Sequence, residues 1–116
     1  MANPDIFQRF LTEKAAVIAI VADFNWNIVN ANKYAEHIFG KTLEGLNFKE
    51  FAIDFSEKFD FDSFMDEPDK KHLLNLSTSS GLPQTFYFSF AKDEKYNYAF
   101  GEINSFEVAE LRNSFL

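Results

Sequence analysis

The sequence predicts a single α+β domain, in which a five-stranded antiparallel sheet carries short helices on one face. Two short apolar segments with strand-like patterns, 16–22 and 28–31, come early in the chain, and three alternating segments come late. Between them, phenylalanines recur every three or four residues, a spacing typical of short helices. The length of 116 residues suits one domain with a buried core.

The first residues predict an N-terminal capping helix, which we assign to residues 1–14. Asn3, Pro4 and Asp5 supply an N-cap, a proline at the first helical position and an acidic residue in the first turn. Apolar residues at helical spacing then form one stripe: Ile6, Phe7, Phe10 and Leu11. We expect this stripe to lie on the sheet or on a partner chain.

The next segment predicts two strands followed by a capped helix. Residues 16–22 are apolar and rich in β-branched side chains, which suits a buried central strand. Residues 23–27 predict a turn, because Asp and Asn side chains bond their own backbone. Asn32 is a good N-cap for the helix, since its side-chain oxygen can accept an amide of the first turn. Gly40 is a good end, because glycine adopts the left-handed conformation without a steric clash.

Three late segments, 73–79, 85–91 and 96–103, predict consecutive strands, because their side chains alternate in character along the chain. Residues 80–83 contain Gly and Pro and predict a hairpin connection between the first two. Residues 92–95 are charged and predict the second turn. The order of elements therefore places two strands early, helices in the middle and three strands late.

From Ser105 the apolar period becomes helical again, with a stripe formed by Val108, Leu111 and Phe115. Gly, Asn and Pro do not follow this stripe, so we expect the helix to continue in a longer protein. We assign residues 15–104 to the core of the domain and residues 105–116 to the start of a C-terminal linker helix.

This arrangement resembles the PAS domain, a sensory module of bacterial signalling proteins. The resemblance covers roughly residues 12–116, and residues 28–40 are similar to the opening of such domains. Glu102, Ile103 and Asn104 fall where PAS domains commonly carry Asp-Ile-Thr, between the last strand and the signalling helix. The resemblance implies that these three residues hand a signal to the C-terminal helix.

By this resemblance, we expect the chain to be a sensory or regulatory domain of a larger protein, itself without catalytic activity. We expect a cytoplasmic location because the sequence has no cysteine, no membrane-spanning apolar run and no signal-peptide pattern. A stimulus or small ligand alters the packing between sheet and helices, and a dimeric C-terminal helix passes the change to a covalently linked output domain. Histidine kinases of two-component systems and diguanylate cyclases are outputs that the resemblance implies. The alternative is a ligand-free, PAS-like dimerisation scaffold.

A third, less favoured interpretation is a small α+β enzyme of conical shape with a buried acid. Asp23 and Asp54 are the acidic residues nearest to apolar runs. We favour a turn cap for Asp23 and a helix surface for Asp54, and we expect no catalytic residues in the domain.

We expect the domain to form a parallel homodimer through its N-terminal helix and its sheet. The face of the last strand that carries Ala99 and Gly101 is smooth enough to accept a helix closely. Symmetric dimers are also the commonest oligomers of soluble proteins.

The 16 phenylalanines predict a core built mainly from aromatic rings. Five of them are candidates for the lining of an apolar ligand cavity: Phe39, Phe48, Phe51, Phe55 and Phe88. The same rings can instead fill that cavity, which we favour because protein interiors are densely packed. Binding of a small apolar ligand stays an open alternative, whereas we expect no cofactor. Heme and non-covalent flavin would compete with the rings for space, and His37 and His72 form no ligand pattern.

Composition argues against several other functions. The chain has no cysteine, which excludes disulfides, thiol nucleophiles and iron–sulfur clusters. A net charge of −7 without a basic cluster argues against nucleic acid and anionic membranes as partners. No apolar run has the length of a membrane span, so we expect no membrane insertion. The acidic stretch 60–69 lacks the glycine and glutamate spacing of a calcium loop, so we expect no metal site.

Overall fold

The computed structural model describes residues 4–53, 63, 65–67 and 70–103. Within them lies a five-stranded antiparallel sheet in the order β2-β1-β5-β4-β3. The strands are β1 (Ile18–Ala22), β2 (Ile28–Ala31), β3 (His72–Ser77), β4 (Pro83–Lys92) and β5 (Asn97–Ile103). The predicted α+β class with this sheet is therefore confirmed.

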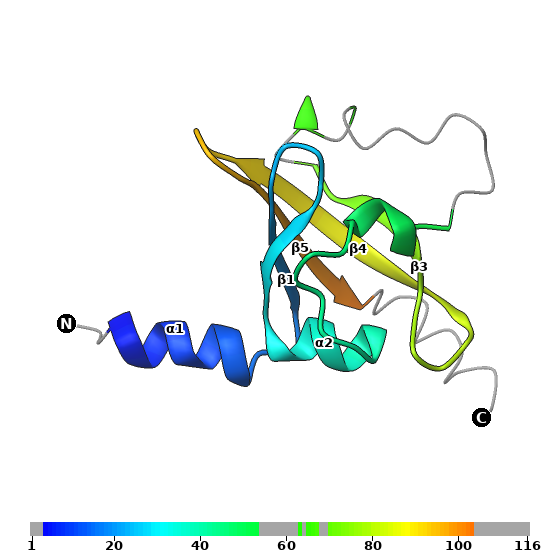
Figure 1. Ribbon diagram of the computed structural model, residues 1–116, viewed down its shortest axis with the longest axis horizontal. Helices are drawn as coiled ribbons and strands as arrows, with labels where there is room; N and C mark the ends of the chain where they lie inside the picture. The colour runs from blue at the N-terminus through cyan, green and yellow to red at the C-terminus, as the bar shows by residue number, and fades with distance from the viewer. Residues whose placement is uncertain (1–3, 54–62, 64, 68–69, 104–116) are drawn as a thin grey trace.

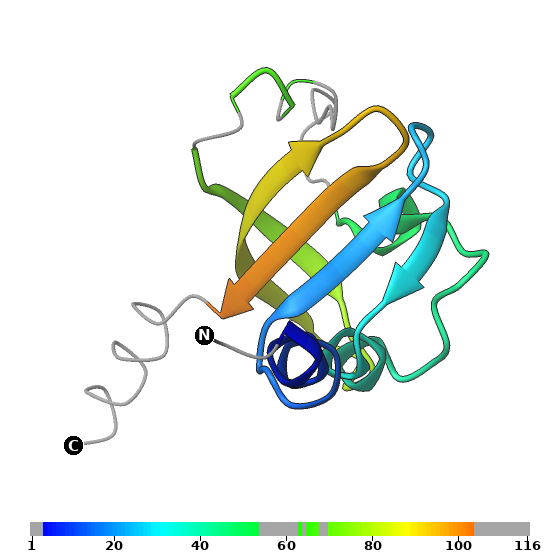
Figure 2. The same ribbon diagram turned by 90° about the vertical axis from the view of Figure 1, so that its left-hand side faces the viewer.

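The sheet is accompanied by α1 (Pro4–Glu13), α2 (Lys33–Phe39) and the 3₁₀-helix η1 (Phe48–Phe51). Helices α2 and η1 cover one face of the sheet, which we call the inner face (Figure 1). Figure 2 looks onto the opposite, outward face, from which α1 projects toward the viewer. The predicted C-terminal helix, together with Asp54, Phe55 and Asn104, lies outside the described residues.

Side chains of the inner face form the core. Alternate residues of β1 and β4 point inward and are buried: Ile18, Ile20, Ala22, Phe86, Phe88 and Phe90. Leu74 and Leu76 of β3 join them from the edge of the sheet. The apolar run 16–22 and the alternation in 73–79 and 85–91 therefore identified these strands correctly.

Helix α2 is fixed at both ends as predicted. The Asn32 side chain accepts a hydrogen bond from the amide of Ala35, so it is the N-cap. Gly40 has φ of 74° and donates its amide to the carbonyl of Glu36 at 2.8 Å. Ser79, in the turn between β3 and β4, donates its amide to the carbonyl of Ile38 at 2.9 Å. The end of α2 is therefore held against that turn.

The prediction that Ala99 and Gly101 lie on an open face that accepts a helix is wrong. Both residues are buried on the inner face. A Cβ atom at Gly101 would lie 2.4 Å from Cζ of Phe88, so the small residues make room for core rings rather than for a partner helix. Phe100, on the other side of the same strand, is 43 % exposed.

Most of the apolar surface of α1 is not covered by the sheet of its own chain. We call Ile6, Phe7, Phe10 and Leu11 the α1 stripe; their side chains are between 45 % and 67 % exposed. Because α1 projects from the body of the domain (Figure 1), the expectation that the stripe covers the sheet of the same chain is wrong. The expectation that it contacts a partner chain stays a prediction.

Candidate functional site

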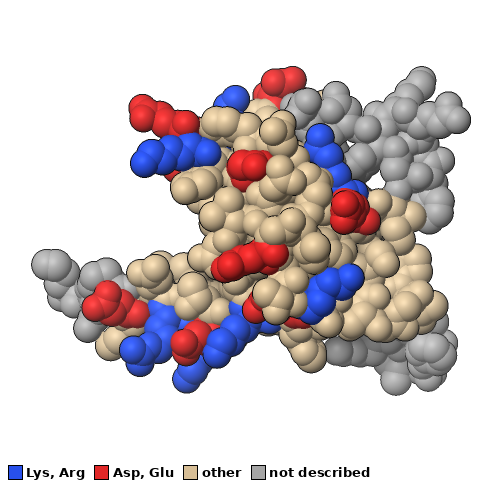
Figure 3. All heavy atoms as spheres, viewed as in Figure 1, with Lys and Arg blue, Asp and Glu red and all other residues tan. Residues whose placement is uncertain are grey.

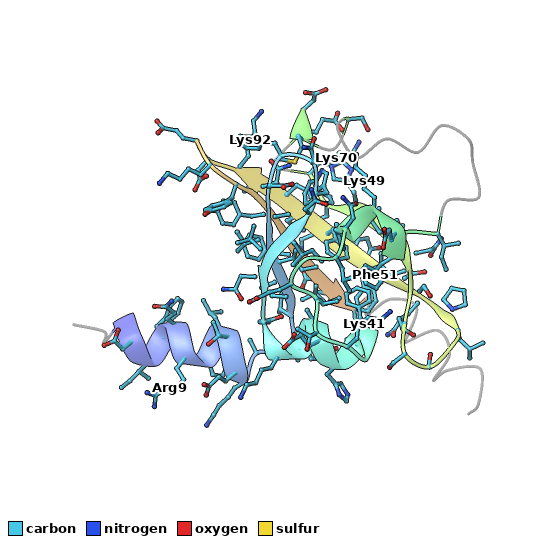
Figure 4. All side chains as sticks on the ribbon, in the orientation of Figure 1. Arg9, Lys41, Lys49, Phe51, Lys70 and Lys92 are labelled. Atoms are coloured by element: carbon cyan, nitrogen blue, oxygen red, sulfur yellow. The ribbon has the colours of Figure 1, made fainter. Side chains whose placement is uncertain are left out.

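The candidate pocket residues lie in the core, between the sheet and the helices that cover it. Phe39, Phe48, Phe51 and Phe88 are all buried. The Phe39 and Phe51 ring centroids are 4.5 Å apart, and those of Phe48 and Phe88 are 5.6 Å apart. These rings thus contact one another in pairs. The expectation that the rings fill the cavity stays a prediction. Lys41 lies over the Phe51 ring, with its Nζ 5.6 Å from the centroid (Figure 4).

Trp26 is a core residue that sequence reasoning missed. It sits in the turn after β1 with φ of 68°, and its side chain is fully buried. Its ring lies 5.7 Å from the ring of Phe48 and 5.7 Å from that of Phe90. The surrounding Asp and Asn residues indicated a turn correctly, but they concealed an inward-pointing side chain. The only tryptophan of the chain was the available signal.

Asp23 closes this turn. Its carboxylate accepts hydrogen bonds from the amides of Asn25 and Asn27, both at 2.9 Å, and from the side chain of Asn27 at 3.1 Å. The bonds from Asn27 are the main cause that lowers the pKa of Asp23. A buried catalytic acid needs a raised pKa, so Asp23 fits the turn-cap interpretation and not the enzyme interpretation.

Hydrogen bonds attach η1 and the residues that follow it to both edges of the sheet. The amide of Phe48 donates to the carbonyl of Trp26 at 2.8 Å, beside β2. At the other end, the amide of Ile53 donates to the carbonyl of Asn75 in β3, also at 2.8 Å. The segment from Phe48 to Ile53 therefore crosses the inner face and holds the Phe48 ring against Phe88.

A continuous set of contacts leads from this core to the end of β5. Phe48 contacts Phe88, and the Phe88 ring lies directly on Gly101. Gly101 immediately precedes Glu102. Glu102 is the first of the three residues expected to pass a signal to the C-terminal helix, which we call the handover residues. Glu102 in turn forms an ion pair with Lys71, with Nζ and Oε1 2.5 Å apart. Any rearrangement of the Phe88 ring therefore bears on the backbone next to Glu102.

A shallow hollow lies where α1 meets the outward face of the sheet. It has a volume of about 110 Å³, and it is lined mostly by apolar atoms. We call it the outward hollow; its lining includes Leu11 of α1, Val21 of β1, Ala31 of β2 and Phe100 of β5. Figure 3 shows the notch between projecting α1 and the rest of the domain.

The turn between β4 and β5 is closed by Asp93. Its carboxylate accepts hydrogen bonds from the amides of Lys95 and Tyr96, both at 2.8 Å, and from the hydroxyl of Tyr98 at 2.5 Å. The bond from Tyr98 is the main cause that lowers the pKa of Asp93, and the same bond raises the pKa of Tyr98. The predicted turn at 92–95 is confirmed.

The sequence matches no family model and no curated protein. Solved structures do match it. The PAS domain of an HTR-like protein from Haloarcula marismortui has a TM-score of 0.66 at 16% identity, over 85% of this chain and 96% of that one. The PAS domain of the quorum-sensing receptor RpfR from Cronobacter turicensis, in complex with BDSF, has a TM-score of 0.61 at 15% identity, over 78% and 96%. The PAS domain of nitrogen regulation protein NR(II) from Vibrio parahaemolyticus has a TM-score of 0.60 at 12% identity, over 89% and 99%.

The chain has the PAS fold. At these identities, the matches establish the architecture and leave ligand and output to be argued from the residues. Within this PAS fold, Asn32 and Gly40 are the predicted caps of α2, and Glu102 and Ile103 end the last strand. The described residues include no cluster of His, Asp or Glu with the geometry of a metal site. None of the described helices has the length and apolar character needed to cross a membrane.

Proposed function

We propose that this PAS domain is the sensory part of a larger signalling protein and acts without catalysis of its own. A stimulus or small ligand changes the packing of the buried aromatic rings on the inner face, which we call the ring core. The end of β5 passes the change to a covalently linked output domain. A histidine kinase of a two-component system and a diguanylate cyclase are the outputs we consider. The observation that carries this proposal is the Phe88 ring, which lies on Gly101 one residue before Glu102.

The mechanism is a shift between two packings of the core. Close-packed rings change position in discrete steps, because the density of a protein interior allows no continuous deformation. If η1 moves, Phe48 moves with it, and Phe88 must adjust against Gly101. The stimulus then needs only to bind one packing better than the other. We place the domain in the cytoplasm and expect no nucleic acid among its partners.

The first test is the handover itself. Glu102→Ala and Asn104→Ala, each made in the full-length signalling protein, are expected to change its output about fivefold or more, a size typical of coupling between sites. Glu102 is exposed, so its loss is expected to change the free energy of unfolding by less than about 0.5 kcal/mol. Glu94→Ala, at an exposed glutamate in the β4–β5 turn, is the matched control. Unchanged output in both handover variants would contradict the proposal.

The second candidate is the ligand-free dimerisation scaffold, which the mutual contacts of the buried rings favour. Thermal unfolding of the purified domain with medium-chain fatty acids, indole, flavin mononucleotide and heme separates the two. A ligand at about 100 times its Kd stabilises the folded state by about 2.7 kcal/mol, which raises Tm by roughly 10 °C in a domain of this size. Such a shift supports a sensor with a ligand cavity. No shift with any compound supports a filled core.

We also propose that the domain associates with a second copy of itself through the α1 stripe and the outward face. The stripe is exposed, and the outward hollow beside it is apolar. Although the chain has a net charge of −7, Lys71 and Glu102 on this face neutralise each other. Arg9 lies on the side of α1 that points away from the notch (Figure 4). A second copy would therefore meet an apolar surface without net charge, whereas an anionic membrane would meet an acidic protein.

A further inference from the structure

The side chain of Asn32 is a buried junction of four segments of the chain. It is 5 % exposed, and its oxygen accepts the amides of Ala19 and Ala35, each at 3.1 Å. Its nitrogen donates to the carbonyl of Leu11 at 3.2 Å and to that of Val17 at 2.6 Å. An asparagine side chain has two N–H donors and an oxygen that accepts two bonds, so all four of its bonds are made.

The two ends of this amide serve different parts of the molecule. The oxygen bonds to β1 and to the first turn of α2, which belong to the body of the domain. The nitrogen bonds to the last part of α1, through Leu11, and to the connection that follows it, through Val17. Because the α1 stripe is exposed, these N–H groups are a principal attachment of α1 to the body.

We infer that Asn32 is the positioning residue of α1, and that it couples the angle of α1 to the position of α2. It holds α1 where the α1 stripe and the outward hollow form one continuous apolar surface, since Leu11 and Asn32 both line that hollow. Helix α2 buries Ala35 and Phe39 in the ring core. A change in the core that moves α2 therefore also reaches α1, which gives the domain a second route of transmission besides the end of β5.

This inference gains its functional meaning from the proposed self-association, yet its structural part is testable alone. Helix capping by itself does not require asparagine, because Asp and Ser are equally good N-caps. Aspartate retains both acceptor bonds, but it replaces the N–H donors with an oxygen that faces two carbonyl oxygens. Asn32→Asp is therefore expected to release α1 while the cap of α2 stays in place.

The experiment compares Asn32→Asp with Asn30→Asp in the full chain. Asn30 also lines the outward hollow, but it is exposed, so its substitution adds the same charge without removing bonds to α1. Hydrogen exchange is measured for each amide, and self-association is measured by sedimentation over a range of concentrations. In Asn32→Asp, the amides of α1 and those of Lys14 and Ala15 are expected to exchange about tenfold faster or more. The reason is the loss of the two hydrogen bonds from the Asn32 side chain to the carbonyls of Leu11 and Val17. Amides of α2 and β5 are expected to keep their rates, and self-association is expected to weaken about tenfold or more.

Each outcome has a separate meaning. Unchanged exchange in α1 of Asn32→Asp, or an equal increase of exchange in α1 of Asn30→Asp, would overturn the role of Asn32. A wild-type chain that stays monomeric at every concentration would overturn the proposed self-association, while the exchange comparison would still test Asn32. If Asn32→Asp does not fold, Asn32→Ser removes the same donors without adding a charge and is measured in its place. Loss of protection throughout the domain in both Asn32→Asp and Asn32→Ser would overturn the inference, because Asn32 would then hold the core and not α1.

Discussion

Gly101→Ala is expected to destabilise the domain by about 1–3 kcal/mol, the usual cost of overpacking a core. The added Cβ would lie 2.4 Å from Cζ and 2.6 Å from Cε2 of Phe88. Phe88 has little freedom to give way, because its ring contacts Phe48 and Phe90 as well. Denaturant unfolding of the variant and the wild type measures the loss.

The cost of this methyl group is expected to depend on the ring opposite. In a Phe88→Leu background, which removes the ring atoms at the clash, Gly101→Ala is expected to cost at least about 1 kcal/mol less than in the wild type. Phe39→Leu, at a buried ring of α2 that contacts Phe51, is the matched control background and is expected to leave the cost unchanged. Equal costs in all backgrounds would show that Phe88 and Gly101 are not coupled, and the proposed route through β5 would lose its first step.

Gly40→Ala is expected to cost about 2–4 kcal/mol, because two effects add at this position. The φ of 74° is a left-handed conformation that costs a residue with a Cβ about 1–2 kcal/mol. In addition, the new Cβ would lie 2.6 Å from Cβ of Ser79, across the contact between α2 and the β3–β4 turn. The free energy of unfolding of the two proteins gives the difference.

The chain offers a control that separates the two effects. Gly45 has φ of 86°, and a Cβ there would meet nothing within 4 Å, so Gly45→Ala is expected to cost only about 1–2 kcal/mol. Ser79→Gly is expected to reduce the cost of Gly40→Ala toward that value. If Gly40→Ala and Gly45→Ala prove equally destabilising, the contact with Ser79 contributes nothing and only the backbone conformation matters.

The strands and the caps of α2 were predictable because their signals are local. Alternation along β4 and the positions of Asn32 and Gly40 depend on residues close in sequence. Local patterns do not determine which side of a strand faces the core, however. Alternation in β5 separated Ala99 and Gly101 from Phe100, but only the volume of the opposing Phe88 ring decides that the small residues point inward.

The junction at Asn32 was predictable only in part for the same reason. Its role as a cap follows from Ala35, three residues later in the sequence. Its bond to Leu11 joins residues that are 21 positions apart, and it exists only because α1 and α2 meet at one corner of the sheet. The burial of Trp26 likewise depends on the placement of η1, through Phe48.

Transmission from the ring core to the end of β5 is tested most directly by hydrogen exchange at Glu102 and Ile103 in two variants of η1. Phe48→Leu changes the residue that contacts Phe88, whereas Phe51→Leu changes a buried ring of the same helix that contacts Phe39. We predict that exchange at Glu102 and Ile103 becomes at least about fivefold faster in Phe48→Leu than in Phe51→Leu when the two variants are compared at equal global stability. Equal rates in both variants would contradict the account, because the end of β5 would then not respond to the packing of Phe48 on Phe88.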